Sequence, residues 1–436
     1  MPFVIGLNQP MDEKKIVTSP FNRTAQHDAK RAAILSQAAR LFNSKGSRAT
    51  TLQDISDALG LTKTSLYYYV KTKEELIFQC YKTTLQHHLR QLDEIDKQNT
   101  DFLMKLKAFF VSFFENWLAA REEHGPYLAA LLEIASLKGG HRKEIESDYI
   151  QMFKRLRQYL RDGVNNGEFR AIETTSATRA ILGSVDWVFS WLHTVPHEEV
   201  KHKAEQAFDI LAKGLYANPT EYTNKAYTQP QLVTPFVQGF NREEQNRLKQ
   251  EAFYKAGTLF FNKRGFSGTS LVDIAKHLNV SKGAFYYYIK NKEDLLYHCY
   301  TYSQSIIDSI YQQADNLDTD AFNRLVMICR SIFRVQNSDE GPLIRYSSIT
   351  AFPIERRQQV LKFSGESELR IRSLIKRGIK DGSIRKIDTL IAQKLLSGAT
   401  NASMEIGLWR KTDNLDNAAY DYFDIFFNGL LPRSGQ

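Results

Sequence analysis

Apolar residues recur along the chain at three- and four-residue spacing, which is the period of an α-helix. In YIQMFKRLRQYLRDGV one stripe runs through Tyr149, Phe153, Leu156 and Leu160. The segment DFLMKLKAFFVSFFENWLA, which begins at Asp101, is apolar on most sides, as is typical of a helix inside a bundle. No stretch alternates apolar and polar residues between turn signals. The pattern therefore predicts an all-α protein.

The pattern is also duplicated. LYYYVKTKEEL, which begins at Leu66, returns as FYYYIKNKEDL at Phe285, 219 positions later. Further on, RLRQYLRDGVNNGEFRAI from Arg155 resembles RIRSLIKRGIKDGSIRKI from Arg370, at an offset of 215. Two copies of about two hundred residues each indicate a duplicated domain rather than a stack of short repeats.

Each copy contains the signals of two short helices around a tight turn. The first helix, TLQDISDALG, has one apolar face and is ended by Gly60, and Thr62 then caps KTSLYYYV. In the second copy Asn279 and Ser281 take these two positions. Two short helices joined by a turn of three or four residues form a helix-turn-helix.

The second helix of this motif has an apolar side and a polar side. Leu66 and Val70 should fasten it to a small core, and consecutive residues point about 100° apart, so three adjacent tyrosines cannot all be buried. Lysine, hydroxyl and phenol groups near a helix N-terminus suit the major groove of DNA. Half-buried packing is the ordinary role of a tyrosine cluster. The duplication, the caps and the flanking lysines favour DNA binding instead.

Both copies resemble the N-terminal DNA-binding domain of TetR-family transcription regulators. The resemblance rests on AAILSQAARLFNSKGSRATTLQDISDALGLTKTSLYYYVKTKEEL and on AFYKAGTLFFNKRGFSGTSLVDIAKHLNVSKGAFYYYIKNKEDL. It implies a ligand-responsive repressor that binds double-stranded operator DNA. The residues that it assigns to bases or phosphates are Thr51, Thr62, Lys63, Thr64, Tyr67, Tyr68, Tyr69 and Lys73 in the first half, and Ser270, Ser281, Lys282, Gly283, Tyr286, Tyr287, Tyr288 and Lys292 in the second.

The two reading helices are not identical. Thr64 stands where the second copy has Gly283, and Ser65 stands where it has Ala284. These positions lie on or beside the polar face. The two halves are therefore expected to prefer different bases.

The duplication also predicts the division of the chain. Family members usually act as homodimers with one reading head per subunit, and this chain carries both heads. We expect an intrachain pseudo-dimer whose heads lie about one turn of DNA, roughly 34 Å, apart; pairing of whole chains stays open. The expected segments are an N-terminal arm (1–23), helix-turn-helix domains (24–80 and 242–299), helical bundles (81–216 and 300–431) and a linker (217–241).

The last helices of each half are the candidate interface between the halves, at about 176–193 with 200–216 and about 388–409 with 417–430. Gly183 and Gly398 match at the 215 offset within these segments. A small residue there allows close helix approach, and a merely tolerated glycine is the equal alternative.

The resemblance further implies an effector pocket in each bundle, mostly apolar with a few polar anchors. A hydrophobic effector is expected, such as a lipid, fatty-acyl or aromatic compound, and the halves differ enough for only one of them to bind it. Ordinary core packing is the more common role of such side chains. The candidate lining residues are Phe109, Phe113, Trp117, Tyr127, Phe153 and Trp187 in the first half, and Met327, Phe333, Tyr346 and Met404 in the second.

Composition adds limits to this picture. The 436 residues carry a formal net charge of +9, which permits an anionic partner without requiring one. Three cysteines form no disulfide framework or zinc spacing, and Pro196 interrupts the histidine cluster around His193, so no metal or cofactor is expected. No Walker loop or nucleophile elbow is present, which argues against an enzyme.

No secretory signal and no apolar run of bilayer length are visible, so we expect a cytoplasmic protein without a membrane partner. One alternative remains: a helical ligand-sensing or interaction protein whose heads no longer bind DNA. The lysines and hydroxyls present in both heads favour the regulator.

Overall fold

The computed structural model describes residues 23–131, 134–223, 242–338, 342–404 and 406–433. Within these ranges the chain is helical and contains no strand beyond one isolated bridge between Tyr216 and Ile384. The all-α prediction is confirmed. Nearly all of the expected N-terminal arm and the linker from residue 224 onward lie outside the described residues.

Within the described residues, each half has three α-helices in its head, followed by five in its bundle. In the first half these are α1 (Arg23–Lys45), α2 (Leu52–Ala58), α3 (Lys63–Tyr69), α4 (Lys73–Asp96), α5 (Phe102–Arg121), α6 (Gly139–Asn165), α7 (Thr174–Asp186) and α8 (Val200–Lys213). In the second half they are α9 (Arg242–Gly268), α10 (Leu271–His277), α11 (Lys282–Tyr288), α12 (Lys292–Asp315), α13 (Ala321–Asn337), α14 (Ile354–Asp381), α15 (Thr389–Ala402) and α16 (Leu415–Phe427).

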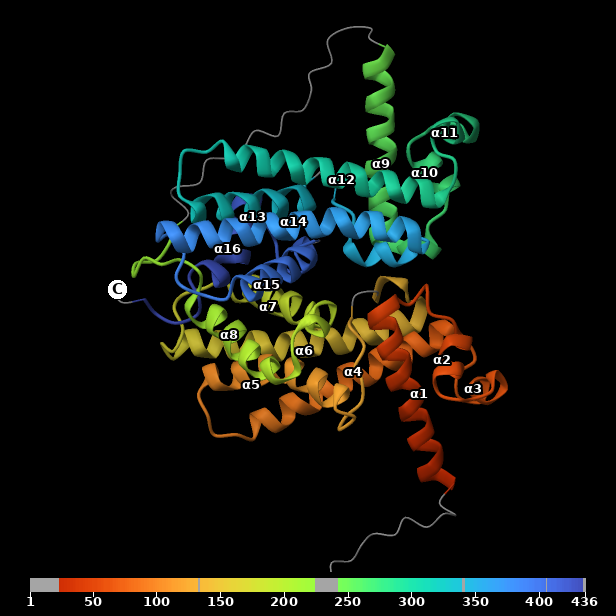
Figure 1. The fold of residues 1–436 in the computed structure, drawn as a ribbon, viewed down its shortest axis with the longest axis horizontal. Coiled ribbons are helices and arrows are strands. Elements are labelled where there is room, and N and C mark those ends of the chain that lie inside the picture. Colours follow the sequence, from red (N-terminus) through yellow and green to blue (C-terminus); the bar gives the residue numbers. More distant parts are fainter. Residues whose placement is uncertain (1–22, 132–133, 224–241, 339–341, 405, 434–436) are drawn as a thin grey trace, which may run out of the picture.

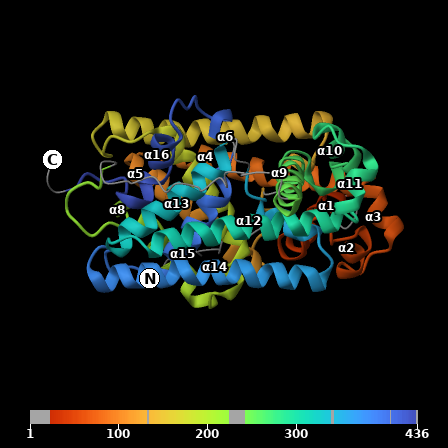
Figure 2. The same cartoon turned by 90° about the horizontal axis from the view of Figure 1, so that it is seen from above.

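The two bundles lie side by side, and both heads lie at the same end of the molecule (Figures 1 and 2). Helices α7 and α15 pack against each other between the halves, and α8 and α16 complete a four-helix seam. One continuous hydrophobic core includes buried residues of both bundles and of the first head, whereas the second head has a core of its own. The bundles therefore form one body.

The seam depends on two glycines. A Cβ atom on Gly398 would lie 2.6 Å from the Cβ of Trp187 and 2.8 Å from the carbonyl oxygen of Gly183. A Cβ atom on Gly183 would lie 2.3 Å from the Cβ of Ala402. Real Cβ atoms do not approach this closely, so both glycines are required for the close helix approach, and the alternative of a merely tolerated glycine is excluded.

Paired electrostatic contacts lock the seam on both sides of its pseudo-two-fold axis. Arg170 forms an ion pair with Asp424 at 2.6 Å. Arg385, the equivalent residue 215 positions later, forms one with Asp209 at the same distance. Both arginines also donate to backbone carbonyls of the opposite half. The arginine in EFRAI and its copy in SIRKI thus tie each half to the other.

The first turns of α7 and α15 add a second pair of such ties. The Glu173 carboxylate caps α7 and forms an ion pair with Arg410 at 2.7 Å. The Asp388 carboxylate caps α15 and forms an ion pair with Lys203 at 2.8 Å. A carboxylate at a helix N-terminus also meets the positive end of the helix dipole. Each acid therefore stabilises its own helix and the seam together.

The described part of the expected linker, residues 217–223, lies against the second half. The Tyr222 backbone amide donates to Asn428 Oδ1 at 2.8 Å, and the centroids of the Tyr222 and Phe322 rings lie 5.1 Å apart. The chain leaving the first bundle therefore continues along the seam.

The seam yields a stability prediction. We expect Gly398→Ala to lower the free energy of unfolding by about 1–3 kcal/mol, because the new methyl group forces α7 and α15 apart. Gly365→Ala is the matched control, since its Cβ would meet open space on α14 and alanine favours a helix by about 0.5–1 kcal/mol. Chemical denaturation measures both. Equal effects of the two substitutions would contradict the proposed role of the close approach.

Candidate nucleic-acid interface

Hydroxyl caps and left-handed turns set the geometry of both heads. Thr62 Oγ1 accepts the Ser65 amide at 3.2 Å at the start of α3, and Ser281 Oγ accepts the Ala284 amide at 3.1 Å at the start of α11. The preceding turns contain Gly60 with φ 63° and Asn279 with φ 54°. The predicted helix-turn-helix is confirmed in both copies, with its caps and its turn residues in place.

Thr51 and Ser270 occupy the caps of the first motif helices. Thr51 Oγ1 accepts the Asp54 amide at 3.0 Å, and the Thr51 amide in turn donates to the Asp54 carboxylate, which forms a capping box. Ser270 Oγ accepts the Asp273 amide at 3.4 Å. These hydroxyls are therefore helix caps, and their predicted contacts with phosphates remain predictions.

Each reading helix exposes the first two residues of its tyrosine run. Tyr67 and Tyr68 are 39% and 71% exposed, and Tyr286 and Tyr287 are 41% and 84% exposed. The anchors Leu66 and Val70 on the opposite side are buried as predicted, and their counterparts in the second head, Phe285 and Ile289, are buried as well. The remaining residues assigned to the reading face are exposed as well: Lys63, Thr64, Lys282 and Gly283.

The third tyrosine of each run turns back toward the first helix of its head. The Tyr69 ring lies 4.8 Å from that of His27, and the Tyr288 hydroxyl donates to Asn246 Oδ1 at 2.9 Å. Both side chains are half-buried. Their geometry is that of packing residues beside the reading face, so a phosphate contact by either remains a prediction.

Two lysines predicted to meet phosphate brace the heads internally. Lys73 Nζ donates to the carbonyl oxygen of Arg48, and Lys292 Nζ donates to that of Thr269, each at 2.9 Å. Burial, reinforced by nearby Arg48, lowers the pKa of Lys292 below its ordinary range. Both lysines connect the fourth helix of a unit to the loop before the motif.

The sequence reasoning missed a contact between the heads. Arg48 of the first head stacks over the ring of Phe266 of the second at 3.9 Å and lies 3.4 Å from Glu293. It also donates to the carbonyl oxygen of Ala351 at 2.7 Å. No local signal marks Arg48, because its partners lie more than two hundred positions away. The contact holds the two heads in a defined relative position.

A repeated asparagine anchors each head to its bundle. Asn43 Nδ2 donates to the Leu128 carbonyl at 2.8 Å and its Oδ1 accepts the Ala130 amide at 2.9 Å. Asn262 makes the equivalent bonds to Leu343 and Arg345, at 2.9 and 3.0 Å. This conservation between the copies was visible in the sequence, but its structural role was not.

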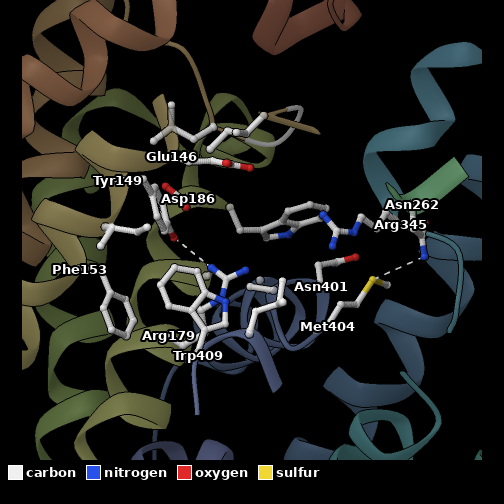
Figure 3. Close-up of a pocket in the computed structure, with 18 of the residues that line it drawn as sticks. Glu146, Tyr149, Phe153, Arg179, Asp186, Asn262, Arg345, Asn401, Met404 and Trp409 are labelled. Atoms are coloured by element: carbon white, nitrogen blue, oxygen red, sulfur yellow. Dashed lines mark hydrogen bonds between the residues drawn. The ribbon is translucent and has the colours of Figure 1, made fainter. Parts of the chain in front are cut away.

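Two cavities, of about 830 and 770 Å³, lie where the seam meets the heads. Both of these cavities are lined by both halves, whereas a smaller cavity of about 170 Å³ lies inside the second bundle, among α12, α13, α14 and α15, with Trp187 of the first half beside it. Of the predicted lining residues, the first cavity contains Phe153 and Met404, which Figure 3 labels, together with Trp187 and Tyr346. The second contains Trp117, Tyr127, Trp187 and Tyr346.

The other predicted pocket residues belong to the hydrophobic core. Phe113 stacks on the buried ring of His88 at 4.3 Å and packs edge-on against Phe109 at 5.3 Å. Phe333 packs against Tyr422 at 5.3 Å, and Met327 is buried. These residues line neither cavity. Apolar character alone did not distinguish them from the residues that do.

Among the described residues, no cluster of three or more His, Cys, Asp or Glu side chains could hold a metal ion. In the same ranges, no helix is long and apolar enough to cross a membrane.

These features define a protein with two helix-turn-helix DNA-binding heads on helical bundles. Residues 34–80 and 254–299 both match the family described as "Bacterial regulatory proteins, tetR family", and residues 101–215 match "Tetracyclin repressor-like, C-terminal domain". The chain therefore belongs to the TetR family and contains its DNA-binding domain twice. It is a DNA-binding transcriptional regulator.

Curated relatives are about half as long as this chain. The repressor KstR2 of Rhodococcus jostii is 27% identical over 198 residues, which cover 45% of this chain and 96% of KstR2. The repressor DhaR of a Mycobacterium species is 26% identical over 186 residues, covering 41% of this chain and 90% of DhaR. Among solved structures, PfmR of Thermus thermophilus is 27% identical with a TM-score of 0.34, covering 41% of this chain and 95% of PfmR.

The first cavity contains a carboxyl group with an unusual protonation equilibrium. Burial raises the pKa of Asp186 from 3.8 to about 7, and Arg179 partly opposes the shift. Between these pH values the folded chain holds a proton that the unfolded chain has released. The neutral carboxyl therefore makes its full contribution to the free energy of unfolding below about pH 4, and this contribution is lost as the pH rises through 7.

We expect Asp186→Asn to raise the free energy of unfolding by about 1–3 kcal/mol at pH 8 and to change it much less at pH 4.5. Asparagine cannot ionise, and it already occupies the equivalent position in the second half, at Asn401. Denaturation at the two pH values measures the difference. The exposed Asp413→Asn is the control, with no pH-dependent gain expected. A gain of the same size at both pH values would refute the assignment.

Proposed function

We propose that this regulator is a ligand-responsive repressor that binds its operator as an intrachain pseudo-dimer. The observation that carries the proposal is the placement of two exposed reading helices, α3 and α11, at the same end of one interlocked body (Figure 1). Its relatives KstR2 and DhaR are named as repressors, which supports this direction of regulation. The cytoplasm, where its DNA would be found, is the expected location.

The contacts between the halves support action as a single chain. A homodimer holds its two heads together only while two subunits associate, whereas here α7 and α15 are parts of one polypeptide. Arg48 further connects the heads through Phe266 and Glu293. Their spacing is thus built into the fold at any protein concentration.

The two reading faces support an operator with imperfect two-fold symmetry. Both present a lysine close to a tyrosine ring, Lys63 over Tyr67 at 5.9 Å and Lys282 over Tyr286 at 5.8 Å. These shared groups suit a common part of each half-site. The hydroxyl of Thr64 has no counterpart at Gly283, so that part of each half-site should differ.

A small-molecule effector is the third part of the proposal. The cavities lie between the seam and the heads, so a bound molecule would contact both. A molecule that binds one arrangement of the heads better than another shifts the population toward it. Release of DNA by such a shift would make the repressor responsive to its ligand.

Selection of genomic fragments with the purified full chain tests DNA recognition. We expect specific fragments whose affinity falls steeply with salt, because the contacts include phosphates. No enrichment over bulk DNA would refute the proposal and would favour a sensing protein without DNA binding.

Disabling one head tests the pseudo-dimer. The variant Tyr67→Ala with Tyr68→Ala should weaken binding to a selected fragment by about a hundredfold, because the contacts of one half-site are lost. The matched control is Met104→Ala, an exposed residue on α5, away from the heads. Gel-shift titrations measure both. A one-headed chain that binds as tightly as the parent would contradict action through two heads.

Exchanging the reading residues tests the asymmetry. We expect Thr64→Gly with Ser65→Ala to shift the preferred site toward two like half-sites, because the first face then matches the second at these positions. Repeated fragment selection with this variant measures the shift. An unchanged preferred sequence would show that these positions do not read bases.

A further inference from the structure

The two cavities are related by the same pseudo-two-fold axis as the halves, but their chemistry has diverged. Phe153 on α6 and Arg179 on α7 line the first cavity. The residues 215 positions later, Glu368 on α14 and Lys394 on α15, line the second. Each pair occupies equivalent positions, so the difference between the cavities arises from the side chains rather than from the fold.

The first cavity has aromatic walls. The Phe153 and Trp409 rings lie 4.5 Å apart, and Tyr149 meets Trp409 edge-on at 6.0 Å. Elsewhere on the lining, Trp187 and Tyr346 meet edge-on at 4.8 Å. Figure 3 shows Phe153, Tyr149 and Trp409 on one side of the cavity and Asn262, Arg345 and Met404 on the other. The flat apolar part of a ligand could pack against these aromatic rings.

The first cavity is also rich in positive charge. Among the described residues, six arginine and lysine side chains line it, against the two carboxyl groups of Glu146 and Asp186, and one of the six, Arg142, is ion-paired with Glu146 at 2.7 Å. Arg179 donates to the neutral Tyr149 hydroxyl at 3.0 Å and lies over the Trp409 ring at 5.2 Å. Because the pKa of Asp186 is raised to about 7, its carboxyl is partly protonated near neutral pH, which lowers the negative charge of the lining. The lining as a whole therefore favours an anionic group.

A buried hydrogen-bond donor points to a ligand as well. The Trp187 side chain is 5% exposed, and its Nε1 atom has no hydrogen-bond acceptor among the described residues. Buried polar atoms are nearly always paired, so such an atom beside a cavity marks a place for an acceptor. Trp187 lines both cavities, so this donor supports a ligand between the halves and does not by itself select the first cavity.

The second cavity has a carboxylate, Glu368, where the first has an aromatic ring. Lys394 forms an ion pair with Glu368 at 2.7 Å, so its charge is neutralised within the protein. In the first cavity the position of that glutamate is taken by the ring of Phe153. Arg357 of the second cavity is also engaged with the first head, where it donates to the Lys45 carbonyl at 2.8 Å.

We propose that the first cavity alone is the effector site, and that it binds one organic anion with a flat aromatic or polycyclic body. The apolar body lies among Phe153, Tyr149 and Trp409, and the anionic group meets Arg179. This proposal rests on the ligand-responsive function proposed above. Because Asn262 on α9 both lines this cavity and anchors the second head, the ligand acts on that head.

Fluorescence titration of the full chain with 8-anilinonaphthalene-1-sulfonate, a flat aromatic anion, tests the site. We expect one bound molecule per chain. Arg179→Met should weaken its binding by about tenfold or more, because a charge-assisted hydrogen bond is lost. Binding of the neutral analogue N-phenyl-1-naphthylamine should change less than about twofold, whereas a merely structural role of Arg179 would weaken both probes.

The duplication supplies the controls. Lys394→Met, at the equivalent position, should leave binding of the anion unchanged. Phe153→Glu copies the ion pair of the second cavity and should abolish binding of the anion, while circular dichroism melting reports whether the variant is folded. Two bound anions per chain, equal effects of Arg179→Met and Lys394→Met, or equal loss of the neutral probe would each overturn the proposal.

The test separates this site from the proposed function, because probe binding is measured without DNA. The expected probe pattern together with unchanged affinity for a selected fragment would support the site and refute the ligand response. The reverse pattern, release of DNA by the anion with no effect of Arg179→Met on either measurement, would overturn the site and leave the ligand response in place.

Discussion

The architecture depends on the close approach of α7 and α15 at Gly183 and Gly398. Without a Cβ atom at either position, the backbones of the two helices come within contact distance. The approach brings the capping acids Glu173 and Asp388 to cations of the opposite half and joins the two bundles into one core. It also leaves both heads at one end and creates the two cavities beside them. The relative position of the two heads and of the two cavities therefore follows from one steric condition.

Some contacts that hold the fold together are the same in both halves, whereas the side chains that face the two cavities differ. Arg170 and Arg385 make the same cross-half ties because the pseudo-symmetric seam needs both of them. Phe153 and Glu368, by contrast, face a cavity that the fold does not require to be filled in one way. A homodimer cannot diverge in this manner, since each substitution appears in both subunits. A single chain can therefore combine two unlike heads and two unlike cavities in fixed proportion.

Much of each head could be predicted because its signals are local. The caps at Thr62 and Ser281 bond to amides three positions ahead, and the left-handed turns at Gly60 and Asn279 follow from single residues. The same local reasoning did not reveal that Lys73 would brace its own head, since its acceptor lies in a loop 25 positions away. It also could not separate core aromatic residues from those beside a cavity.

The helical class, the duplication and the helix-turn-helix in each copy could all be predicted from the amino-acid sequence, because they depend on spacings of three or four residues and on the similarity of the two halves. The contact of the two heads through Arg48, and the lining of the two larger cavities by both halves, appear only in the folded structure. Those features arise when rigid surfaces more than two hundred positions apart dock against each other. Their shape and charge must fit in space, and no local period along the chain records that fit.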